Sequence, residues 1–216
     1  MPMQKLFEFG LLAFTSIFTM VNPLGVIPIY TSMTSEMTSH EAKKVAIKAV
    51  ITATITLLLF AFAGRFIFDF FQISVNSLKV VGGIIFFMAG FDMLQARLIR
   101  TKSDNETITE FANDISITPL AIPLICGPGA ITAAIVMMND AHQIPQKIVL
   151  SGVIILVLAI TLIVLLSSRK VMRFLGDSGN KVLMRIMGLI VMVIAVEFLF
   201  SGLKPILRDI FSGIKV

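Results

Sequence analysis

The chain has 216 residues, of which 56% are hydrophobic and 14% are charged, and its mean hydropathy is +0.95. A soluble domain of this length cannot bury so much apolar surface, so the composition indicates an integral membrane protein in a lipid bilayer. The net charge of +5 comes without a basic stripe carrying interleaved aromatic residues, which argues against a nucleic-acid partner.

Six apolar segments follow one another along the chain. Each is long enough to cross about 30 Å of hydrocarbon, which takes about 20 helical residues. The sequence therefore predicts an all-α, polytopic membrane protein with six transmembrane helices. In chain order the spans are expected at Leu6–Thr31, Glu41–Phe68, Ser74–Leu98, Ile115–Met138, Lys147–Ser168 and Asn180–Leu203.

The first span carries a helix-breaking motif, Asn22-Pro23-Leu24-Gly25. Proline lacks a backbone N–H and clashes with the preceding turn, so several backbone polar groups lose their helical partners there. Such groups cannot face lipid, but they can be buried in protein or line a watered cavity. Because proline is favoured as the first residue of a helix, Pro23 is expected to open a second half-helix.

Local signals place the next boundaries. Thr38 and Glu41 have the spacing of a capping box, which predicts that the second span begins there. Ser74 is a plausible cap for the third span and Asp177 for the sixth. Between the third and fourth spans, residues 100–114 are polar and contain few large apolar side chains, so we expect a flexible connector. It separates a first three-helix repeat, 1–99, from a second, 115–216.

The fourth span repeats the break of the first. Its motif is Gly127-Pro128-Gly129-Ala130, at a similar depth in the span. A shift of 105 residues aligns the two halves without a gap. Since each half has three spans, the second must enter the membrane from the opposite side, which is an inverted 3+3 repeat with helices 1 and 4 broken. The alternative is that two apolar three-span units align loosely by chance. The aligned pairs are Pro23 with Pro128, Gly25 with Ala130, Arg65 with Lys170, Gly83 with Gly188 and Asp92 with Glu197.

Both breaks together predict a ligand site near the middle of the bilayer. The N-terminus of each half-helix would offer free N–H groups and a positive dipole end to an anionic group, and glycine would let a ligand approach the backbone. Two alternatives remain open, because Pro and Gly often only kink membrane helices and threonine often bonds its own backbone. The candidate substrate-binding residues are Thr19, Asn22, Pro23, Leu24, Gly25, Ile125, Gly127, Pro128, Gly129, Ala130 and Thr132.

Two acidic residues lie inside predicted spans. Ionisable groups in membranes usually have a function, so Asp92 and Glu197 are candidates for ion coupling or gating. Counted along their helices, however, both lie close to an interface, where a carboxylate can simply be hydrated or paired with Arg97 or Lys204. Both interpretations stay open.

Eleven of the eighteen Lys and Arg residues fall on one predicted face of the membrane. Because basic residues accumulate on the cytoplasmic side, both termini are expected outside the cytoplasm.

The chain has no GxxxxGK[ST] motif for ATP and no GxSxG or HExxH motif for hydrolysis, so we expect no enzyme, no cofactor and no metal, with any energy coming from an H⁺ or Na⁺ gradient. The single Cys126 excludes an internal disulfide.

Four stretches resemble the MarC family (UPF0056) of bacterial and archaeal inner-membrane proteins: NPLGVIPIY (22–30), GGIIFFMAGFDML (82–94), PLAIPLICGPGAI (119–131) and RIMGLIVMVIAVEF (185–198). The resemblance implies a plasma-membrane protein with six spans in an inverted arrangement, related to the LysE-type transporter superfamily. It also implies that some members carry small neutral amino acids. The family's motif residues correspond here to Asn22, Pro23, Gly25, Pro28, Pro119, Pro123, Gly127, Pro128, Gly129 and Ala130.

The predicted function is therefore secondary transport of a small neutral amino acid or a similar zwitterionic solute, held by the half-helix N-termini. The alternatives are an exporter of drugs or metabolites and a non-transporting membrane subunit. The sequence predicts a small-molecule substrate and a lipid environment as partners. It specifies neither the substrate, the direction, the coupling ion nor the oligomeric state.

Overall fold

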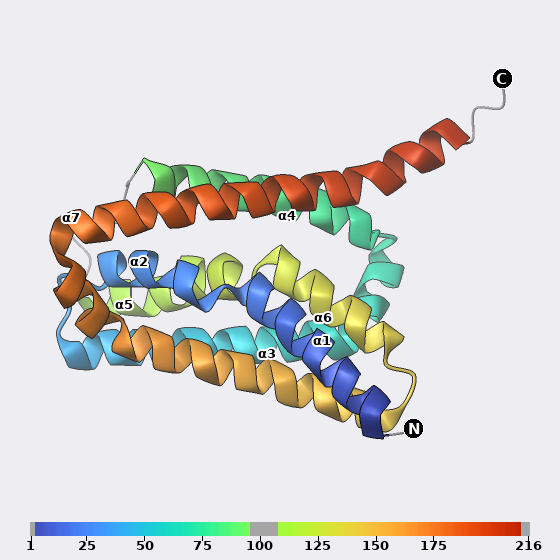
Figure 1. Cartoon of the computed structure of the whole chain (residues 1–216), viewed down its shortest axis with the longest axis horizontal. Coiled ribbons are helices and arrows are strands. Elements are labelled where there is room, and N and C mark those ends of the chain that lie inside the picture. The colour runs from blue at the N-terminus through green and yellow to red at the C-terminus, as the bar shows by residue number, and fades with distance from the viewer. Residues whose placement is uncertain (1–2, 96–107, 213–216) are drawn as a thin grey trace.

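The computed structural model describes residues 3–95 and 108–212, and within these ranges all secondary structure is helical (Figure 1). Most boundaries lie within a few residues of those expected from the sequence. The elements in chain order are α1 (Met3–Val21), α2 (Pro23–Met33), α3 (Ser39–Phe71), α4 (Val75–Leu94), α5 (Ile108–Ile115), η1 (Ser116–Ile125), α6 (Pro128–Asp140) and α7 (Ile144–Ser212).

Five described segments are long and apolar enough to cross a membrane. A sixth is formed if the bent pair Phe111–Ile125 and Pro128–Asp140, whose axes differ by 58°, counts as one span. The prediction of a polytopic helical membrane protein is therefore confirmed. The five spans are Met3–Met33, Ser39–Phe71, Val75–Leu94, Ile144–Lys170 and Lys181–Phe211.

The helices form two layers. In Figure 1, α4 and the second half of α7 run side by side along the top, over a layer made of α1, α2, α3, α5, α6 and the first half of α7. The buried core lies mainly in the lower layer, around α3, with Ile17, Leu57 and Leu158 almost completely buried. Large apolar side chains such as Phe66 are exposed on the outside, as expected of a surface solvated by lipid. Both ends of the described chain lie at the right-hand end of the bundle.

The predicted fifth and sixth spans belong to one element, α7, which turns sharply at Gly176. Gly176 has φ +67°, a left-handed conformation that glycine adopts without steric cost. Figure 1 shows the chain reversing there and returning along the upper layer. The side chain of Asp177, the predicted cap of the sixth span, lies outside the part of the chain that the structure describes.

The two helices of the upper layer are in backbone contact. A Cβ added at Gly83 would stand 2.8 Å from the carbonyl oxygen of Ala195 and 2.9 Å from the backbone nitrogen of Leu199. A side chain at position 83 would therefore push α4 away from α7. Small residues at crossings of this kind let membrane helices approach closely.

A second close contact lies further along the same two helices. Here the glycine belongs to α7 and the backbone atoms beside it belong to α4. A Cβ added at Gly188 would stand 2.7 Å from the carbonyl oxygen of Gly90 and 2.6 Å from the backbone nitrogen of Leu94. Each residue of this second contact is 105 positions from its counterpart in the first. The counterparts are Gly83 with Gly188, Gly90 with Ala195 and Leu94 with Leu199.

Two of the predicted helix caps are confirmed. The Thr38 hydroxyl accepts from the Glu41 N–H at 3.3 Å, and the Glu41 carboxylate accepts from the Thr38 N–H at 2.8 Å, so the capping box is complete. Ser74 accepts from the Ser77 N–H at 3.0 Å and begins α4. In both cases a side-chain oxygen satisfies an N–H group that has no partner within the helix.

The region expected to be a connector is partly helical. Residues 108–114 belong to α5, in which Phe111 and Ile115 stand one turn apart and are buried. These two apolar side chains pack into the core, and their burial stabilises the helix. The sequence did not predict this helix because most of its other residues are polar. Lys48 of α3 also donates to the Asn113 side chain at 2.9 Å. Residues 100–107 of the expected connector lie outside the described residues.

Arg169 of α7 ties the first half of that helix to the turn between α2 and α3. Its guanidinium donates to the carbonyl oxygens of Thr34 at 2.8 Å and Met37 at 2.7 Å, and to the Ser39 hydroxyl at 3.1 Å. The side chain therefore satisfies carbonyl groups just beyond the C-terminal end of α2, where no helical donor follows.

We predict that Arg169→Ala lowers the free energy of unfolding by about 3 kcal/mol, because it removes the hydrogen bonds that the charged guanidinium donates to Thr34, Met37 and Ser39. The neighbouring Lys170→Ala is the matched control, since Lys170 is exposed and its loss should change stability by less than about 0.5 kcal/mol. Reversible unfolding in mixed micelles measures both. Equal stabilities of the two variants would contradict the assignment.

Candidate functional site

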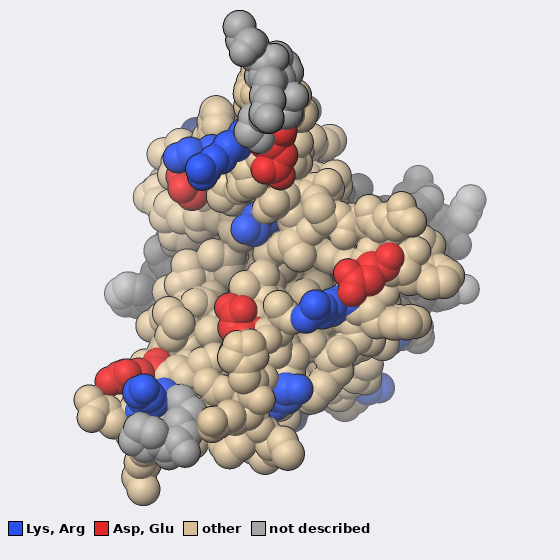
Figure 2. All heavy atoms as spheres, turned by 90° about the vertical axis from the view of Figure 1, so that its right-hand side faces the viewer, with Lys and Arg blue, Asp and Glu red and all other residues tan. Residues whose placement is uncertain are grey.

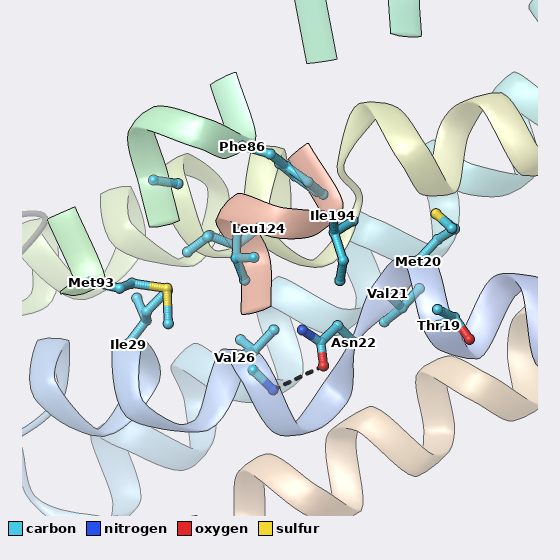
Figure 3. Close-up of a pocket in the computed structure, with 13 residues that line it drawn as sticks. Thr19, Met20, Val21, Asn22, Val26, Ile29, Phe86, Met93, Leu124 and Ile194 are labelled. Atoms are coloured by element: carbon cyan, nitrogen blue, oxygen red, sulfur yellow. Dashed lines mark hydrogen bonds between the residues drawn. The ribbon is translucent and has the colours of Figure 1, made fainter. Parts of the chain in front are cut away.

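The first predicted break is present. α1 ends at Val21, α2 begins at Pro23, and Asn22 between them has φ 47° and ψ 64°. Asparagine tolerates this left-handed conformation better than most residues. Its side-chain oxygen accepts from the Gly25 N–H at 3.3 Å, which caps α2 (Figure 3). The amide nitrogen of Asn22 has no hydrogen-bond acceptor among the described residues.

The second predicted break is also present and is more elaborate. α6 begins at Pro128, after Gly127, and no side chain caps it. Before the break, η1 has extended backbone at Thr118 and Ile122. Each precedes a cis proline, and a residue before proline is disfavoured in the helical region. The fourth span is therefore interrupted at several points, whereas the sequence predicted one break.

Asn22 lines a small cavity between the broken first span and the upper layer (Figure 3). The space open to the centre of a water-sized sphere is about 30 Å³, enough for only a few water molecules. Among the described residues, none that lines the cavity is charged. The first wall consists of Thr19, Met20, Val21, Asn22, Gly25, Val26 and Ile29, and the opposite wall of Phe86, Ala89, Met93, Leu124, Val191 and Ile194.

The cavity lies where the two halves of the sequence face each other. Three pairs of its lining residues are separated by 105 positions, the same interval that relates the two contacts between α4 and α7. The pairs are Thr19 with Leu124, Phe86 with Val191 and Ala89 with Ile194.

The predicted site residues divide into three groups. Thr19, Asn22 and Gly25 line the cavity. Gly129 and Thr132 line a separate groove. The others line neither hollow: Leu24 is 57% exposed on the outside, while Pro23, Ile125, Gly127, Pro128 and Ala130 are buried in protein contacts. In this conformation the two half-helix N-termini therefore do not open into one pocket.

The glycines at the breaks make room for protein side chains. The space beside Gly25 is occupied by the Asn22 amide, and that beside Gly127 by the Phe86 ring. The sequence predicted that these positions would leave the backbone open to a ligand. Here instead they allow Asn22 and Phe86 to pack against the backbone and form the cavity wall.

The groove at Gly129 and Thr132, which we name the outer groove, lies between α1, α4, α6 and α7 and has a volume of about 470 Å³. It contains three ionisable side chains, Lys79, Asp140 and Glu197. α6, which contributes Asp140, ends at the right-hand side of Figure 1. Figure 2 shows that end of the molecule, where small groups of basic and acidic side chains stand on a mostly uncharged surface.

The two candidate coupling residues have different surroundings. Glu197 is exposed and lines the outer groove, whereas Asp92 is half-buried and lines neither hollow. Neither makes an ion pair with another residue in the described ranges. Their proposed pairing with Lys204 is not observed, and Arg97 lies outside these ranges.

Two threonines, Thr15 of α1 and Thr56 of α3, bond to the backbone of their own helices. Thr15 donates to the carbonyl oxygens of Leu11 and Leu12, both at 3.0 Å, so its hydroxyl is satisfied by its own helix. Thr56 likewise donates to the Thr52 carbonyl oxygen. Sequence reasoning left this alternative open, and for these two residues it holds.

Several lining residues were missed. Phe86, Ala89 and Met93 occupy one face of α4, spaced by three and four residues, but so do many apolar residues of a membrane helix. For Phe86 and Ala89, the one feature that sets them apart from other apolar residues of α4 is that the residues 105 positions later, Val191 and Ile194, also line the cavity. Lys79 had a clearer signal, as a cation near the start of an apolar span. Within the described ranges, no cluster of His, Cys, Asp and Glu could hold a metal ion.

Comparisons with known proteins agree with this architecture. The family model described as "MarC family integral membrane protein" matches residues 7–207. A UPF0056 membrane protein of Methanocaldococcus jannaschii is 37% identical over 91% of this chain and 97% of its own length. One of Pyrococcus abyssi is 38% identical over 88% and 92%, and one of Buchnera aphidicola is 36% identical over 94% and 96%. No solved structure matches.

Proposed function

The chain belongs to the MarC family of integral membrane proteins, and on this premise we propose that it is a secondary transporter of small neutral amino acids or similar zwitterionic solutes. The family is represented in bacteria and archaea, and its relatives' names state a membrane protein without an activity. The proposal therefore depends on the site itself.

The observation that carries it is the cavity at Asn22. A polar side chain with a free amide nitrogen stands at a helix break, among uncharged walls, in the interior of a membrane protein. Polar groups in such a place usually serve a ligand or an ion pathway. An amide can donate to a carboxylate, and backbone carbonyls freed at the break can accept from an ammonium group. Walls without charge suit a solute without net charge.

The volume of the cavity indicates an occluded conformation. A free amino acid has at least five heavy atoms and needs more space than a few water molecules occupy. Transport then requires the walls to separate, and the inverted repeat that we propose supplies two equivalent ways of doing so. The exchanged contacts at Gly83 and Gly188 and the paired cavity residues support that repeat.

A further pair of contacts is similar in the two halves, although Arg65 and Arg169 are 104 rather than 105 positions apart. Arg169 binds the turn that follows α2, and Arg65 of α3 donates to the side chain of Asn139 near the end of α6. The two arginines thus bind near the C-terminal ends of α2 and α6, the half-helices that follow the two breaks.

We propose that both termini face away from the cytoplasm, as the distribution of Lys and Arg predicts, and that a gradient of H⁺ or Na⁺ drives transport. Kinship with LysE-type transporters stays a prediction.

Purified protein in proteoliposomes tests the proposal. We predict that labelled glycine, alanine or serine accumulates above the level in protein-free liposomes when a proton or a sodium gradient is imposed separately. Labelled lysine and glutamate serve as controls, because the uncharged cavity should exclude them. No accumulation of any neutral amino acid, under either gradient or in exchange against internal substrate, would overturn the proposal.

A further inference from the structure

The outer groove holds charged groups that lack partners. Lys79 is half-buried, while Glu197 and Asp140 are exposed, and none of the three side chains makes an ion pair or hydrogen bond with another residue in the described part of the chain. The absence of a side chain at Gly202 leaves room for the stem of Lys79, since an added Cβ would stand 2.9 Å from the Lys79 Cβ. Ionisable groups in the helices of a membrane protein usually have a function.

One residue that lines this groove also carries a buried hydroxyl. Thr132 is 4% exposed, lines the groove, and its Oγ1 has no hydrogen-bond partner among the described residues. It stands one turn after Gly129, at the start of α6, which no side chain caps. A buried polar atom without a partner costs free energy, which a ligand in the groove would recover.

Two side chains separate the outer groove from the Asn22 cavity. Met20 lines both hollows, and Phe198 lines the groove. Both pack against Gly129, where an added Cβ would stand 2.8 Å from the Phe198 ring and 3.1 Å from the Met20 sulfur. These two side chains therefore stand between residues of the outer groove and the cavity that Met20 also lines.

We propose that the outer groove is a second binding site, where a small zwitterionic solute is held before it reaches the cavity. Lys79 binds the carboxylate, the Thr132 hydroxyl donates to it, and Glu197 binds the ammonium group. Met20 and Phe198 form the partition that the solute crosses next. The inference deepens the proposed function and rests on it in one respect, namely that the solute held here is the one transported.

The opposite side of the cavity is closed in this conformation. The residues 105 positions from Met20 and Phe198 are Ile125 and Met93, which are 0% and 1% exposed. Ser16 lines the outer groove, and its counterpart Ala121 is completely buried. The outer groove therefore reaches toward the cavity from one side only. Ser16 in the groove and the buried Ala121 form a matched pair of positions whose accessibility can be compared.

Cysteine labelling tests the site directly. In a Cys126→Ala background, Ser16→Cys should react with a membrane-impermeant trimethylammonium methanethiosulfonate from one side of a proteoliposome, and Ala121→Cys should not react. Glycine at ten times its dissociation constant should slow the labelling of Ser16→Cys about tenfold. If Ser16→Cys does not fold, Ser201→Cys on the α7 wall replaces it.

Charge-removing variants test the assigned roles. Lys79→Met and Glu197→Gln should each raise the KM for uptake about tenfold or more, with kcat within about threefold, because each loses a charge-assisted contact at a site that captures the solute. Lys204→Met is the control, since Lys204 is exposed and outside the groove. Its KM should equal that of the wild type.

The outcomes separate the two proposals. Labelling that glycine does not slow, or no labelling of either groove cysteine, overturns the second site even if the wild type transports. Unchanged KM values for Lys79→Met and Glu197→Gln overturn it as well. Protection by glycine in a protein that transports no amino acid would support the site and overturn the proposed function.

Discussion

Asn22→Gly should lower kcat/KM for uptake at least about tenfold while leaving the folded protein nearly as stable as the wild type. Glycine adopts the left-handed conformation of position 22 without strain, and replacing an asparagine N-cap with glycine costs only a few tenths of a kcal/mol. What the variant removes is the amide that faces the cavity. Loss of one hydrogen bond to a charged group corresponds to a tenfold effect or more.

The measurement is initial uptake by proteoliposomes of the amino acid that the wild type carries best, with thermal unfolding recorded on the same preparations. Thr15→Ala is the matched control, because the Thr15 hydroxyl bonds only to its own helix and does not line the cavity. Wild-type kinetics for Asn22→Gly, with Thr15→Ala also unchanged, would exclude Asn22 from the ligand site.

Gly188→Ala should be strongly destabilising although it adds a single methyl group. That methyl would stand 2.6 Å from the Leu94 nitrogen and 2.7 Å from the Gly90 oxygen, and backbone atoms cannot rotate away as side chains do. The two helices of the upper layer must separate, and we expect a loss of about 2 kcal/mol or more in the free energy of unfolding.

Gly152→Ala is the control for that substitution. An added Cβ at Gly152 meets no atom within 4 Å, so alanine should raise stability by about 0.5–1 kcal/mol through its better helix propensity. Unfolding in mixed micelles of the wild type and both variants gives the comparison. If Gly188→Ala is as stable as Gly152→Ala, the close crossing of α4 and α7 is wrong.

The two breaks were predictable because their causes are local. Pro23 and Pro128 cannot continue a helix, and Thr38 and Ser74 cap helices through bonds to residues three positions away. Such effects depend on neighbours in sequence, so the sequence shows them. The apolar runs similarly predicted the spans, since their length is set by the thickness of a bilayer.

The surroundings of the site were not predictable in the same way. Phe86 forms part of the cavity wall because it packs against Gly127, which is 41 positions away. Gly129 and Asn22 line different hollows, and α6, which carries Gly129, is bent by 58° from the segment Phe111–Ile125 that precedes it. Both are consequences of tertiary packing, which no local pattern encodes. The interval of 105 residues was the one long-range signal in the sequence, and the two glycines that it pairs, Gly83 and Gly188, make similar contacts between α4 and α7.

The close crossing of α4 and α7 also constrains the order of events during synthesis. Gly83 leaves the ribosome 112 residues before Ala195, the residue against which its backbone packs. At about 5–20 residues per second, α4 waits roughly 6–22 s for its partner. During that time a strip of glycine backbone is open to lipid or to another nascent chain. Biogenesis of this protein therefore includes an interval in which the face of α4 that packs against α7 lacks its native neighbour, although the segment around Gly127 and Pro128, against which Phe86 and Gly82 pack, has already been made.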